Sequence, residues 1–435
     1  MKKVMIKTSL SLAVTLASTQ LFASGFALNE QSISGMGTGF AGRSSSVDDA
    51  SIVYGNPAGM SRLKRQQATV GVAAIDAKTD ISDARGRAAG TNDGDMVPFT
   101  AVPMGFYVNP IDEHWAFGFG VYAPFGLVTD YEDSFQGRNF GSKSQVKIVT
   151  FQPTVSYAFN DKVSIGFGPT INRISGVLES ALNVSGLTLP ITGRPSGDGR
   201  VQVKGDDVGY GFNVGLMVQA TDTTNLGLTY HSKVTYKLEG HTEVTPGAGV
   251  PGGILRAGRY DAKLSLDTPE SVDFSLTQKL TDDWKVSAGS TWTRWSRLKA
   301  ITVQNSGITA AGGGAAASQL VGTINEDQNW HDTWAYAIGT SYQVNKQWTL
   351  RTGLTWDQSP TNNTDRSPRI PTGDRTIFSI GAGWSPTDDI TVDVAYSYLD
   401  EEKVRVNRTN ALGNAYSAKY DNSANGFGLG LTYRF

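Results

Sequence analysis

The sequence predicts an all-β chain that closes into a 14-stranded antiparallel transmembrane β-barrel, with an N-terminal plug (hatch) in its lumen. Three observations support this fold class. A short polar turn followed by strict alternation of apolar with small or polar residues recurs near residues 110, 160, 222, 282, 345 and 387. Longer stretches separate these copies. Nothing after residue 23 approaches the ~18 consecutive apolar residues of a membrane helix. Hairpins with short turns at one end and long loops at the other are typical of membrane barrels.

Residues 1–23 have the pattern of a secretory signal peptide. Lys2 and Lys3 precede an apolar run from Ser9 to Ala17, and a small residue, Ala23, ends the segment. The apolar run is too short to span a bilayer as a helix. We expect cleavage after Ala23, with cleavage after Ser24 as the alternative.

Residues 24–65 form the predicted plug. This segment is rich in Gly and Ser and shows little strand-like alternation. It is too small to bury a core of its own. We therefore expect it to pack inside the barrel, which is the only available container.

Residues 66–435 form the predicted barrel. Trp115, Phe117 and Phe119 lie on one face of a strand and Gly118 and Gly120 on the other, and the same period of two continues along the chain. The six short turns alternate with seven longer loops, so that thirteen connections join fourteen strands, an even number as in single-chain bacterial barrels. The expected loops lie near residues 80–97, 127–143, 180–200, 239–258, 305–322, 357–374 and 400–420.

The tryptophans that follow short turns predict an aromatic belt at one membrane interface. These residues are Trp115, Trp284 and Trp348. The mean hydropathy of −0.24 does not contradict a membrane protein, because a barrel strand shows only every second residue to lipid.

The composition excludes several classes of function. The formal net charge of −2 argues against a nucleic-acid partner. The chain has no cysteine, so thiol chemistry and disulfides are excluded, and its four histidines show no nucleophile signature. We expect no enzyme activity, no cofactor and no metal site.

The last residues alternate up to the terminal carboxylate, from Phe427 to Phe435. A final strand that ends in phenylalanine resembles the assembly signal of bacterial outer-membrane proteins. It implies that the barrel assembly machinery recognises Phe435, that the chain lies in the bacterial outer membrane among its lipids, and that both termini are periplasmic. We expect a monomer.

Several segments resemble the FadL family of outer-membrane transporters for long-chain fatty acids and other hydrophobic compounds. They are the run from Ser24 to Gln31, Gly55-Asn-Pro-Ala-Gly, Asn160-Asp-Lys-Val-Ser-Ile-Gly-Phe-Gly, Thr293-Arg-Trp-Ser, the run from Arg351 to Pro360, and Ile370-Pro-Thr-Gly-Asp-Arg. The resemblance covers essentially the whole mature chain. It implies a 14-stranded barrel with an N-terminal hatch, capture of the ligand at the outer loops, an internal apolar pocket, and lateral release at a kinked strand.

Two groups of plug residues are candidates for the site. In Asn56-Pro57-Ala58, the proline fixes a backbone turn and the asparagine side chain can hold the plug in register by hydrogen bonds. The alternative is an ordinary Asn-Pro turn. Phe26 and Leu28 must leave water, and would either line the ligand pocket or simply pack the plug against the wall.

Gly120, Pro124 and Gly126 are candidates for the strand kink and the lateral opening. Proline deletes a ladder hydrogen bond, and glycine permits a bulge or a close approach. The resemblance implies an inward kink in the third strand at this position. Alternatively, Pro124 ends the strand where it enters a loop.

Two cations are candidates for binding a carboxylate head group. If Trp330, Trp334, Tyr336 and Ile338 face lipid, His331 faces the lumen, at a position where the family often has lysine. Arg173 lies near a second family position for a pocket cation, but strict alternation points it outward. An inward Arg173 would require a bulge, and the alternative is an arginine that snorkels at the outer interface.

The expected function is outer-membrane transport of long-chain fatty acids, without direct energy input. Uptake of aromatic or alkane hydrocarbons through the same fold is the alternative, and a general diffusion porin is a weaker one, because porins have no N-terminal plug.

Overall fold

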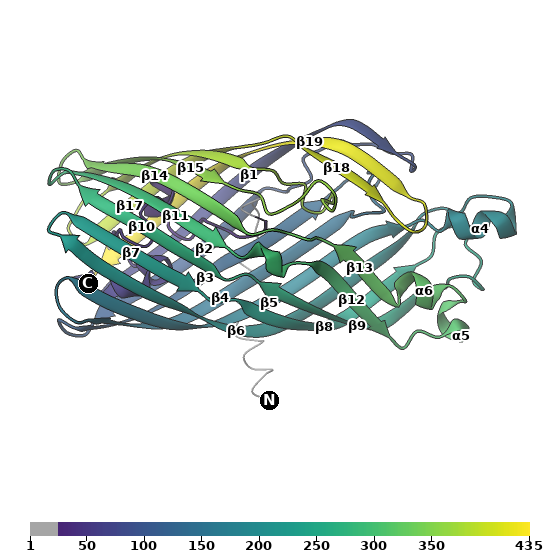
Figure 1. The fold of residues 1–435 in the computed structure, drawn as a ribbon, viewed down its shortest axis with the longest axis horizontal. Coiled ribbons are helices and arrows are strands. Elements are labelled where there is room, and N and C mark those ends of the chain that lie inside the picture. Colours follow the sequence, from purple (N-terminus) through teal and green to yellow (C-terminus); the bar gives the residue numbers. More distant parts are fainter. Residues whose placement is uncertain (1–24) are drawn as a thin grey trace.

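The computed structural model describes residues 25–435. The predicted signal peptide and its cleavage site therefore lie outside the described residues. In the described part of the chain the strands form a single antiparallel sheet, drawn in Figure 1. The sheet closes on itself because β1 (Gln67–Gly86) pairs with β2 (Thr100–Pro110) on one side and with the last strand, β19 (Ala415–Arg434), on the other. Closure pairs the first strand with the last, so neither of them leaves a free sheet edge for the lipid to meet.

The wall consists of fourteen strands, as the sequence predicts. In five of them a short irregular stretch divides the strand into two labelled segments, namely β7/β8, β9/β10, β11/β12, β13/β14 and β17/β18. The remaining bounds are β3 (Trp115–Asp130), β4 (Lys143–Ala158), β5 (Val163–Leu182), β6 (Gly199–Thr221), β7 (Thr224–His231), β8 (Val234–Thr245), β9 (Gly258–Thr268), β10 (Ser271–Lys279), β11 (Trp284–Thr293), β12 (Ala300–Ser306), β13 (Thr323–Asp327), β14 (Thr333–Gln343), β15 (Trp348–Asp357), β16 (Arg375–Trp384), β17 (Ile390–Glu401) and β18 (Val404–Thr409).

The six predicted short turns all lie at the end of the barrel where the chain terminates (Figure 1). The predicted long loop over 400–420 is wrong: β18 and β19 continue through it, and the turn is confined to residues 410–414. In this hairpin Val404 and Val406 are buried whereas Arg405 is exposed. Its outer face carries polar residues, so the hairpin lacks the lipid-type alternation that predicts a membrane strand.

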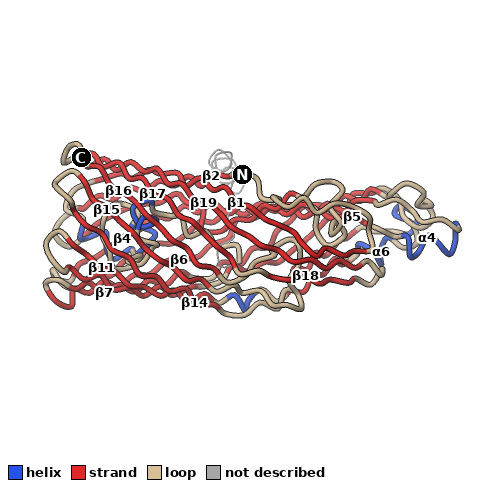
Figure 2. Tube along the Cα trace, turned by 90° about the horizontal axis from the view of Figure 1, so that it is seen from above, coloured by secondary structure: helices blue, strands red, loops and turns tan. Residues whose placement is uncertain are grey.

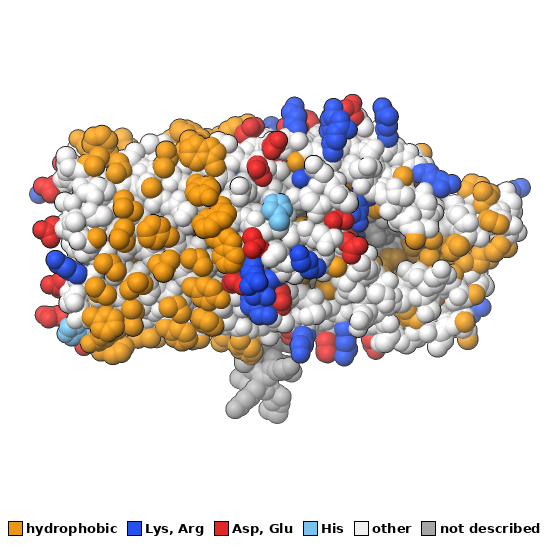
Figure 3. Space-filling model, viewed as in Figure 1, with side chains coloured by type: hydrophobic (Ala, Val, Ile, Leu, Met, Phe, Trp, Pro, Cys, Tyr) orange, Lys and Arg blue, Asp and Glu red, His pale blue; other side chains and the backbone are white. Residues whose placement is uncertain are grey.

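A belt of large apolar side chains surrounds the half of the barrel near the short turns (Figure 3). Charged residues gather beyond it, toward the long loops (Figure 3). The three tryptophans predicted for the interface belong to the belt, with exposed fractions of 45% for Trp115, 44% for Trp284 and 42% for Trp348. An apolar band that ends in aromatic residues is what lipid contact requires.

The predicted plug, of which the structure describes residues 25–65, lies inside the barrel. It contains three short helices, α2 (Ile33–Gly37), α3 (Ile52–Gly55) and the 3-10 helix η1 (Pro57–Arg62). Helix α2 lies against β16 and β17, and η1 lies against β4, β5 and β6, so the plug crosses the lumen from wall to wall (Figure 2). The other helices are η2 (Trp295–Arg297), in the wall, and α4 (Ser185–Thr192), α5 (Ala310–Gly313) and α6 (Ala317–Val321), at the loop end. None of the helices in residues 25–435 is long and apolar enough to cross a membrane.

Where the plug meets the wall, the wall residue is repeatedly glycine, and we call this set the glycine collar. At each position an added Cβ would come within about 3.1 Å of a plug atom. At Gly227 it would lie 1.8 Å from the Ser44 carbonyl oxygen, and at Gly353 2.1 Å from the Thr38 carbonyl. The collar therefore lets the plug backbone come closer to the sheet than any side chain would permit. Its members are Gly71, Gly118, Gly166, Gly215, Gly227, Gly289, Gly339, Gly353, Gly381, Gly426, Gly428 and Gly430.

Wall hydroxyl groups next to the collar satisfy buried plug groups. Thr355 donates its Oγ1 hydrogen to the Gly39 carbonyl (2.7 Å), and Thr229 donates to the Gly55 carbonyl (2.7 Å). Ser45 and Thr277 share a hydrogen bond between their hydroxyls (2.7 Å). Since buried polar groups without partners are costly, these bonds fix the position of the plug.

Replacing Gly227 with valine tests the collar. The new side chain would overlap the plug backbone at Ser44, and overpacking of this kind costs about 1–3 kcal/mol. We expect the barrel to assemble and the plug to be displaced. Limited proteolysis of the folded protein should then cleave the plug faster than in the original protein.

Gly105→Val is the matched control, because the nearest atom to an added Cβ lies 3.9 Å away, on Val70. Equal protease sensitivity of the two variants would contradict the role of the collar.

Candidate functional site

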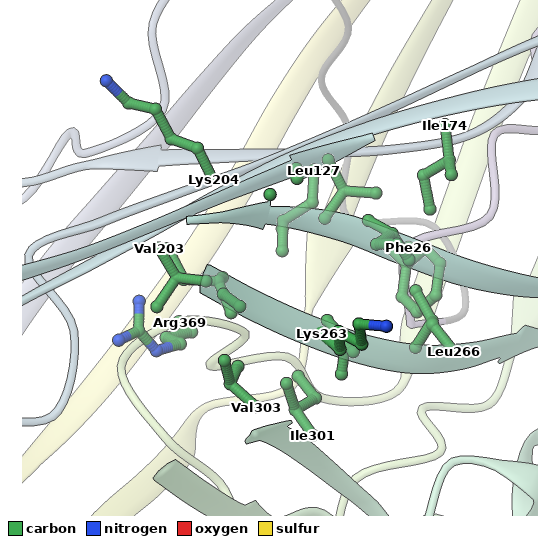
Figure 4. A pocket seen from close by; sticks show the side chains of 18 of the residues that line it. Phe26, Leu127, Ile174, Val203, Lys204, Lys263, Leu266, Ile301, Val303 and Arg369 are labelled. Carbon is green, nitrogen blue, oxygen red and sulfur yellow. The ribbon is translucent and has the colours of Figure 1, made fainter. Parts of the chain in front are cut away.

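The lumen above the plug contains an apolar cavity, shown in Figure 4. It encloses about 820 Å³ of empty space, counting the part open to solvent. Phe26 comes from the plug, and wall strands and inward-folded stretches supply the rest. We call it the apolar cavity; its lining includes Phe26, Leu127, Val146, Ile174, Leu178, Val203, Leu238, Leu264, Leu266, Leu298, Ile301, Val303 and Ile370.

Three basic residues also line the apolar cavity, but none has a free charge inside it. Lys263 lies 3.5 Å from Glu239, and both side chains are largely exposed. Lys204 is exposed, and its side chain extends away from the cavity in Figure 4. Arg369 forms a 3.0 Å ion pair with Glu326. The cavity is therefore suited to an aliphatic or aromatic group.

The loop of residues 358–374 folds inward and forms part of the cavity. Its Ile370 is buried in the apolar lining. Arg369 donates hydrogen bonds to the Lys143 carbonyl (2.9 Å) and the Ser144 hydroxyl (2.9 Å), on β4. These bonds attach the loop to the opposite wall, because β4 is not adjacent to the loop's own strands.

Phe26 lies at the centre of an aromatic cluster. Its ring centroid is 5.0 Å from that of Trp295, 5.7 Å from that of Phe125 and 6.0 Å from that of Trp330. Phe26 is 4% exposed. Rings at such separations stabilise one another beyond their buried area, so the cluster closes the apolar cavity on the plug side.

The N-terminal segment, Gly25–Asn29, pairs with β3. The Leu28 N–H donates to the Pro124 carbonyl (2.8 Å), and the Gly126 N–H donates to the Phe26 carbonyl (2.9 Å). Ala27 and Phe125 form an isolated antiparallel bridge. The plug thus supplies a short extra strand to the wall.

β3 is irregular where the segment binds. Its register with β4 shifts between Tyr122 and Phe125, which is a bulge at Ala123-Pro124. Its pairing with β2 ends at Val121, so residues 122–130 of β3 have no ladder partner on β2. Gly120 lies against the Phe106 ring, which an added Cβ would approach to 2.8 Å. The wall is therefore held at this point by the plug instead of the neighbouring strand.

A second cavity, here called the inner cavity, lies on the other side of the N-terminal segment. It encloses about 840 Å³ by the same measure. Leu28 lines it, whereas Phe26 lines the apolar cavity, so the segment separates the two. Both apolar and polar side chains form its wall, which includes Arg43, Tyr54, Tyr122, Pro124, Phe125, Thr150, Thr170, Asn172, Asn213, His231, Ser232, Tyr236 and Asp357.

Asn56 fastens the lower part of the plug. It is fully buried, and its Nδ2 donates to the Ser44 carbonyl (2.7 Å) and the Leu216 carbonyl of β6 (3.0 Å). Its Oδ1 accepts from the Ala58 N–H (3.0 Å), which caps η1, and Pro57 is the first residue of that helix. The Asn56 side chain therefore joins two parts of the plug to the wall. Asn56-Pro57-Ala58 lies at this contact between plug and wall, and not in either cavity.

The predicted inward orientation of His331 is wrong. His331 is exposed, whereas Trp330 is 2% exposed and packs on Phe26. Residues 328–332 interrupt the strand, with a left-handed backbone at Asn329 (φ 45°), and this reverses the alternation that continues from Trp334. His331 therefore does not reach either cavity.

Arg173 points outward, and β5 has no bulge that would turn it inward. It pairs in unbroken register with Val149 and Val208, between the buried Asn172 and Ile174. Its guanidinium lies 3.4 Å from Asp206 on the outer face. The family resemblance implied that Arg173 is a cation of the ligand pocket, and this expectation is wrong. The strict alternation of the strand predicted the correct, outward orientation of its side chain.

Sequence reasoning missed Trp295, Arg369 and Arg43, and its assignment of Trp330 to the lipid face is wrong. Trp295 and Trp330 share one reason. Both lie in irregular stretches, 294–299 and 328–332, that divide strands. In both stretches a run of polar residues interrupts the alternating pattern, and this interruption could have predicted the break in the strand. Arg369 lies in an inward-folded loop and Arg43 in the plug, neither of which has a periodic pattern.

Comparison with known proteins supports these observations. The sequence matches the family described as outer membrane protein transport protein (OMPP1/FadL/TodX) over residues 14–435. It is 29% identical over 460 residues to a long-chain fatty acid transport protein of Escherichia coli O6:H1, covering 100% of this chain and 99% of that protein. It is 28% identical to outer membrane protein P1 of Haemophilus influenzae, covering 98% of each chain.

Solved structures agree. A Pseudomonas aeruginosa FadL homologue superimposes with a TM-score of 0.83 at 27% identity, covering 94% of this chain and 100% of that chain. The Pseudomonas putida toluene transporter TodX gives 0.72 at 21% identity, covering 96% and 99%, which shows the shared fold alone. Since the family match spans nearly the whole chain and includes the barrel just described, the protein belongs to the OMPP1/FadL/TodX family of outer-membrane transport proteins.

Proposed function

We propose that the protein takes up long-chain fatty acids across the outer membrane, without direct energy input, and releases them laterally at β3. The observation that carries this proposal is the apolar cavity, whose plug side is closed by the same segment that completes the wall at β3. Relatives from Escherichia coli and Salmonella typhi that are named long-chain fatty acid transport proteins support the ligand class.

Capture begins at the loop end. There Leu189 and Ile191 of α4 are 48% and 68% exposed. Exposed apolar groups on a loop can collect a sparingly soluble ligand before it enters the lumen. These residues are therefore candidates for the first contact.

Binding in the apolar cavity follows from the hydrophobic effect. Each buried CH₂ contributes about 0.8 kcal/mol, so a tail of about twelve methylenes gains roughly 10 kcal/mol before the entropic cost of binding. This gain needs few polar contacts. It explains why a cavity with almost no free charge can hold such a ligand.

Release requires the N-terminal segment to move. A ligand in the apolar cavity competes with Phe26 for the ring surfaces of Trp295 and Trp330. Displacement of Phe26 would break the two backbone bonds between the segment and β3. The part of β3 without a partner on β2 would then open the wall sideways to the membrane. No step needs an energy source, because the ligand moves down its own concentration gradient.

Hydrocarbon uptake is the second candidate. The ion pair between Arg369 and Glu326 favours it, because it leaves no free cation in the apolar cavity. Toluene transporters also share the fold. The function of a general diffusion porin is less well supported, because the plug crosses the lumen. A large, stable aqueous current through the intact protein would be needed to support that function.

Other parts of the proposal concern maturation. Residues 1–23 would be removed as a signal peptide, residues 24–65 would act as the hatch, and residues 66–435 would form the membrane domain. The exposed Phe435, whose N–H donates to the Gln66 carbonyl (2.8 Å), would be recognised by the barrel assembly machinery. The protein would act as a monomer.

Asn56→Ala should impair uptake while leaving the barrel folded. The change removes three hydrogen bonds of a buried side chain, at a cost of about 2–4 kcal/mol to plug docking. We expect fatty-acid uptake in a transporter-deficient strain to fall several-fold at an unchanged level of folded barrel. Asn414→Ala, in the outer hairpin, is the control and should transport normally; equal uptake by both variants would oppose the proposed role of Asn56.

A disulfide between positions 27 and 125 should block release. The chain has no cysteine, and the Cα atoms of an antiparallel bridge lie about 4.5–5.5 Å apart, within disulfide range. In the variant Ala27→Cys/Phe125→Cys we expect oxidation to stop uptake and reduction to restore it.

The matched control is Ser379→Cys/Ser397→Cys, which joins two paired wall residues far from the segment. Its uptake should not depend on oxidation. If the 27–125 disulfide left uptake unchanged, release would not require the N-terminal segment to move.

Two neighbouring residues of β5 face in opposite directions: Ile174 lines the apolar cavity, and Arg173 points to the outer face. Ile174→Asn places an amide in the apolar lining, and we expect ligand affinity to fall about tenfold or more. Arg173→Ala changes the outward residue next to it and should alter affinity by less than about twofold. Calorimetric titration of both purified variants measures this; a larger loss with Arg173→Ala would place the ligand elsewhere.

A further inference from the structure

Arg43 is a plug cation with unused hydrogen-bonding capacity. It lines the inner cavity. Its Nη2 donates to the Asn29 Oδ1 (2.9 Å), and its guanidinium carbon lies 5.1 Å from the centroid of the Phe40 ring. Within residues 25–435 it makes no other side-chain hydrogen bond and no ion pair. A guanidinium has five N–H donors, so four remain available.

Other arginines inside the barrel do not share this property. Arg351 pairs with Asp393 (2.7 Å), Arg375 pairs with Glu401 (2.9 Å), and Arg369 pairs with Glu326. Arg43 is only partly buried and has no such counter-ion among the described residues, and a hydrogen bond between a cation and an anion is stronger than one between neutral groups. The inner cavity would therefore be stabilised by an anion at Arg43.

The surroundings of Arg43 suit a polar head group. Tyr54 and His231 stack beside it with centroids 4.9 Å apart, and the buried Nε2 of His231 has no hydrogen-bond partner in the described chain. Asn172 and Asn213 contribute further polar wall. These groups could share the bonds of a bound oxygen anion.

Three carboxyl groups lie in the same region and could compete for Arg43, namely Asp357, Asp273 and Glu30. Asp357 lines the inner cavity and lies 3.9 Å from Arg375. Asp273 accepts from the Thr291 hydroxyl (2.7 Å), and neither it nor Glu30 forms an ion pair with Arg43. Burial raises the pKa of Glu30, which favours its neutral form. The positive charge of Arg43 is therefore not cancelled by a direct contact.

The inner cavity also lies on the path of release. Leu28, Pro124 and Phe125 line it, so it begins where the N-terminal segment meets the β3 bulge. A ligand whose tail has passed Phe26 toward this opening would bring its head close to the plug.

We propose that Arg43 is the anion-binding residue of the inner cavity and takes the carboxylate head of the ligand on the release side of the N-terminal segment. This proposal rests on the proposed uptake function and specifies its ligand as an amphipathic carboxylate. The hydrocarbon alternative predicts no such contact.

Calorimetric titration of the purified full-length protein in detergent tests this with two probes, an eighteen-carbon carboxylate and the primary alcohol of the same chain length. We expect the original protein to bind the carboxylate about tenfold more tightly, as for a charge-assisted hydrogen bond. Arg43→Gln should lose this preference while its affinity for the alcohol changes by less than about twofold.

Asn29→Ala is the matched control, because it removes the hydrogen-bond partner of Arg43 and keeps the guanidinium. It should retain the preference for the carboxylate. If Arg43→Gln does not assemble, the absence of a preference in the original protein would still overturn the proposal.

Equal affinities of the original protein for the two probes would overturn the role of Arg43 and leave uptake of neutral hydrophobic ligands intact. An Arg43→Gln variant that keeps the preference, or loses both affinities equally, would also overturn it. Binding of neither probe by the original protein would instead refute the proposed function, and the role of Arg43 with it.

Discussion

The close contact between the plug backbone and the glycine collar is the constraint on which the rest of the structure depends. A segment of about forty residues cannot form its own core, and this chain has no cysteine to brace it. The wall supplies the missing support, through glycines that admit the plug backbone and hydroxyl groups that satisfy it. With the plug fixed across the lumen, the space above it becomes an apolar cavity instead of an aqueous pore.

The N-terminal segment links the ligand site to the wall. Phe26 closes the apolar cavity, and the backbone of the same few residues bonds to β3 at the bulge where β2 provides no partner. One segment thus has two sets of contacts, with the cavity and with the sheet. In the proposed mechanism, a ligand that competes for the first set would weaken the second, because both belong to the same short strand. Under this proposal, the free energy of ligand binding would favour opening of the wall.

Much of the fold could be predicted from sequence because a barrel wall imposes a period of two. The six turns, the fourteen strands and the outward direction of Arg173 all follow from it. The site could not be predicted as well, because its residues lie where the period fails. His331 and Trp330 exchange faces across an irregular stretch, Arg369 comes from an inward-folded loop, and Arg43 belongs to a plug whose path depends on the wall around it. The kink residues gave a partial signal, since proline and glycine are rare in regular strands.

The central claim is that the apolar cavity holds the ligand and that its occupation displaces the N-terminal segment. An experimental structure of the protein with a bound long-chain fatty acid tests this most directly. We expect ligand density between Phe26 and Ile370, with Phe26 moved away from Trp295 and Trp330 and the bond between Leu28 and Pro124 broken. Ligand density confined to the outer surface, or a filled cavity with Phe26 and its bonds to β3 unchanged, would contradict the account.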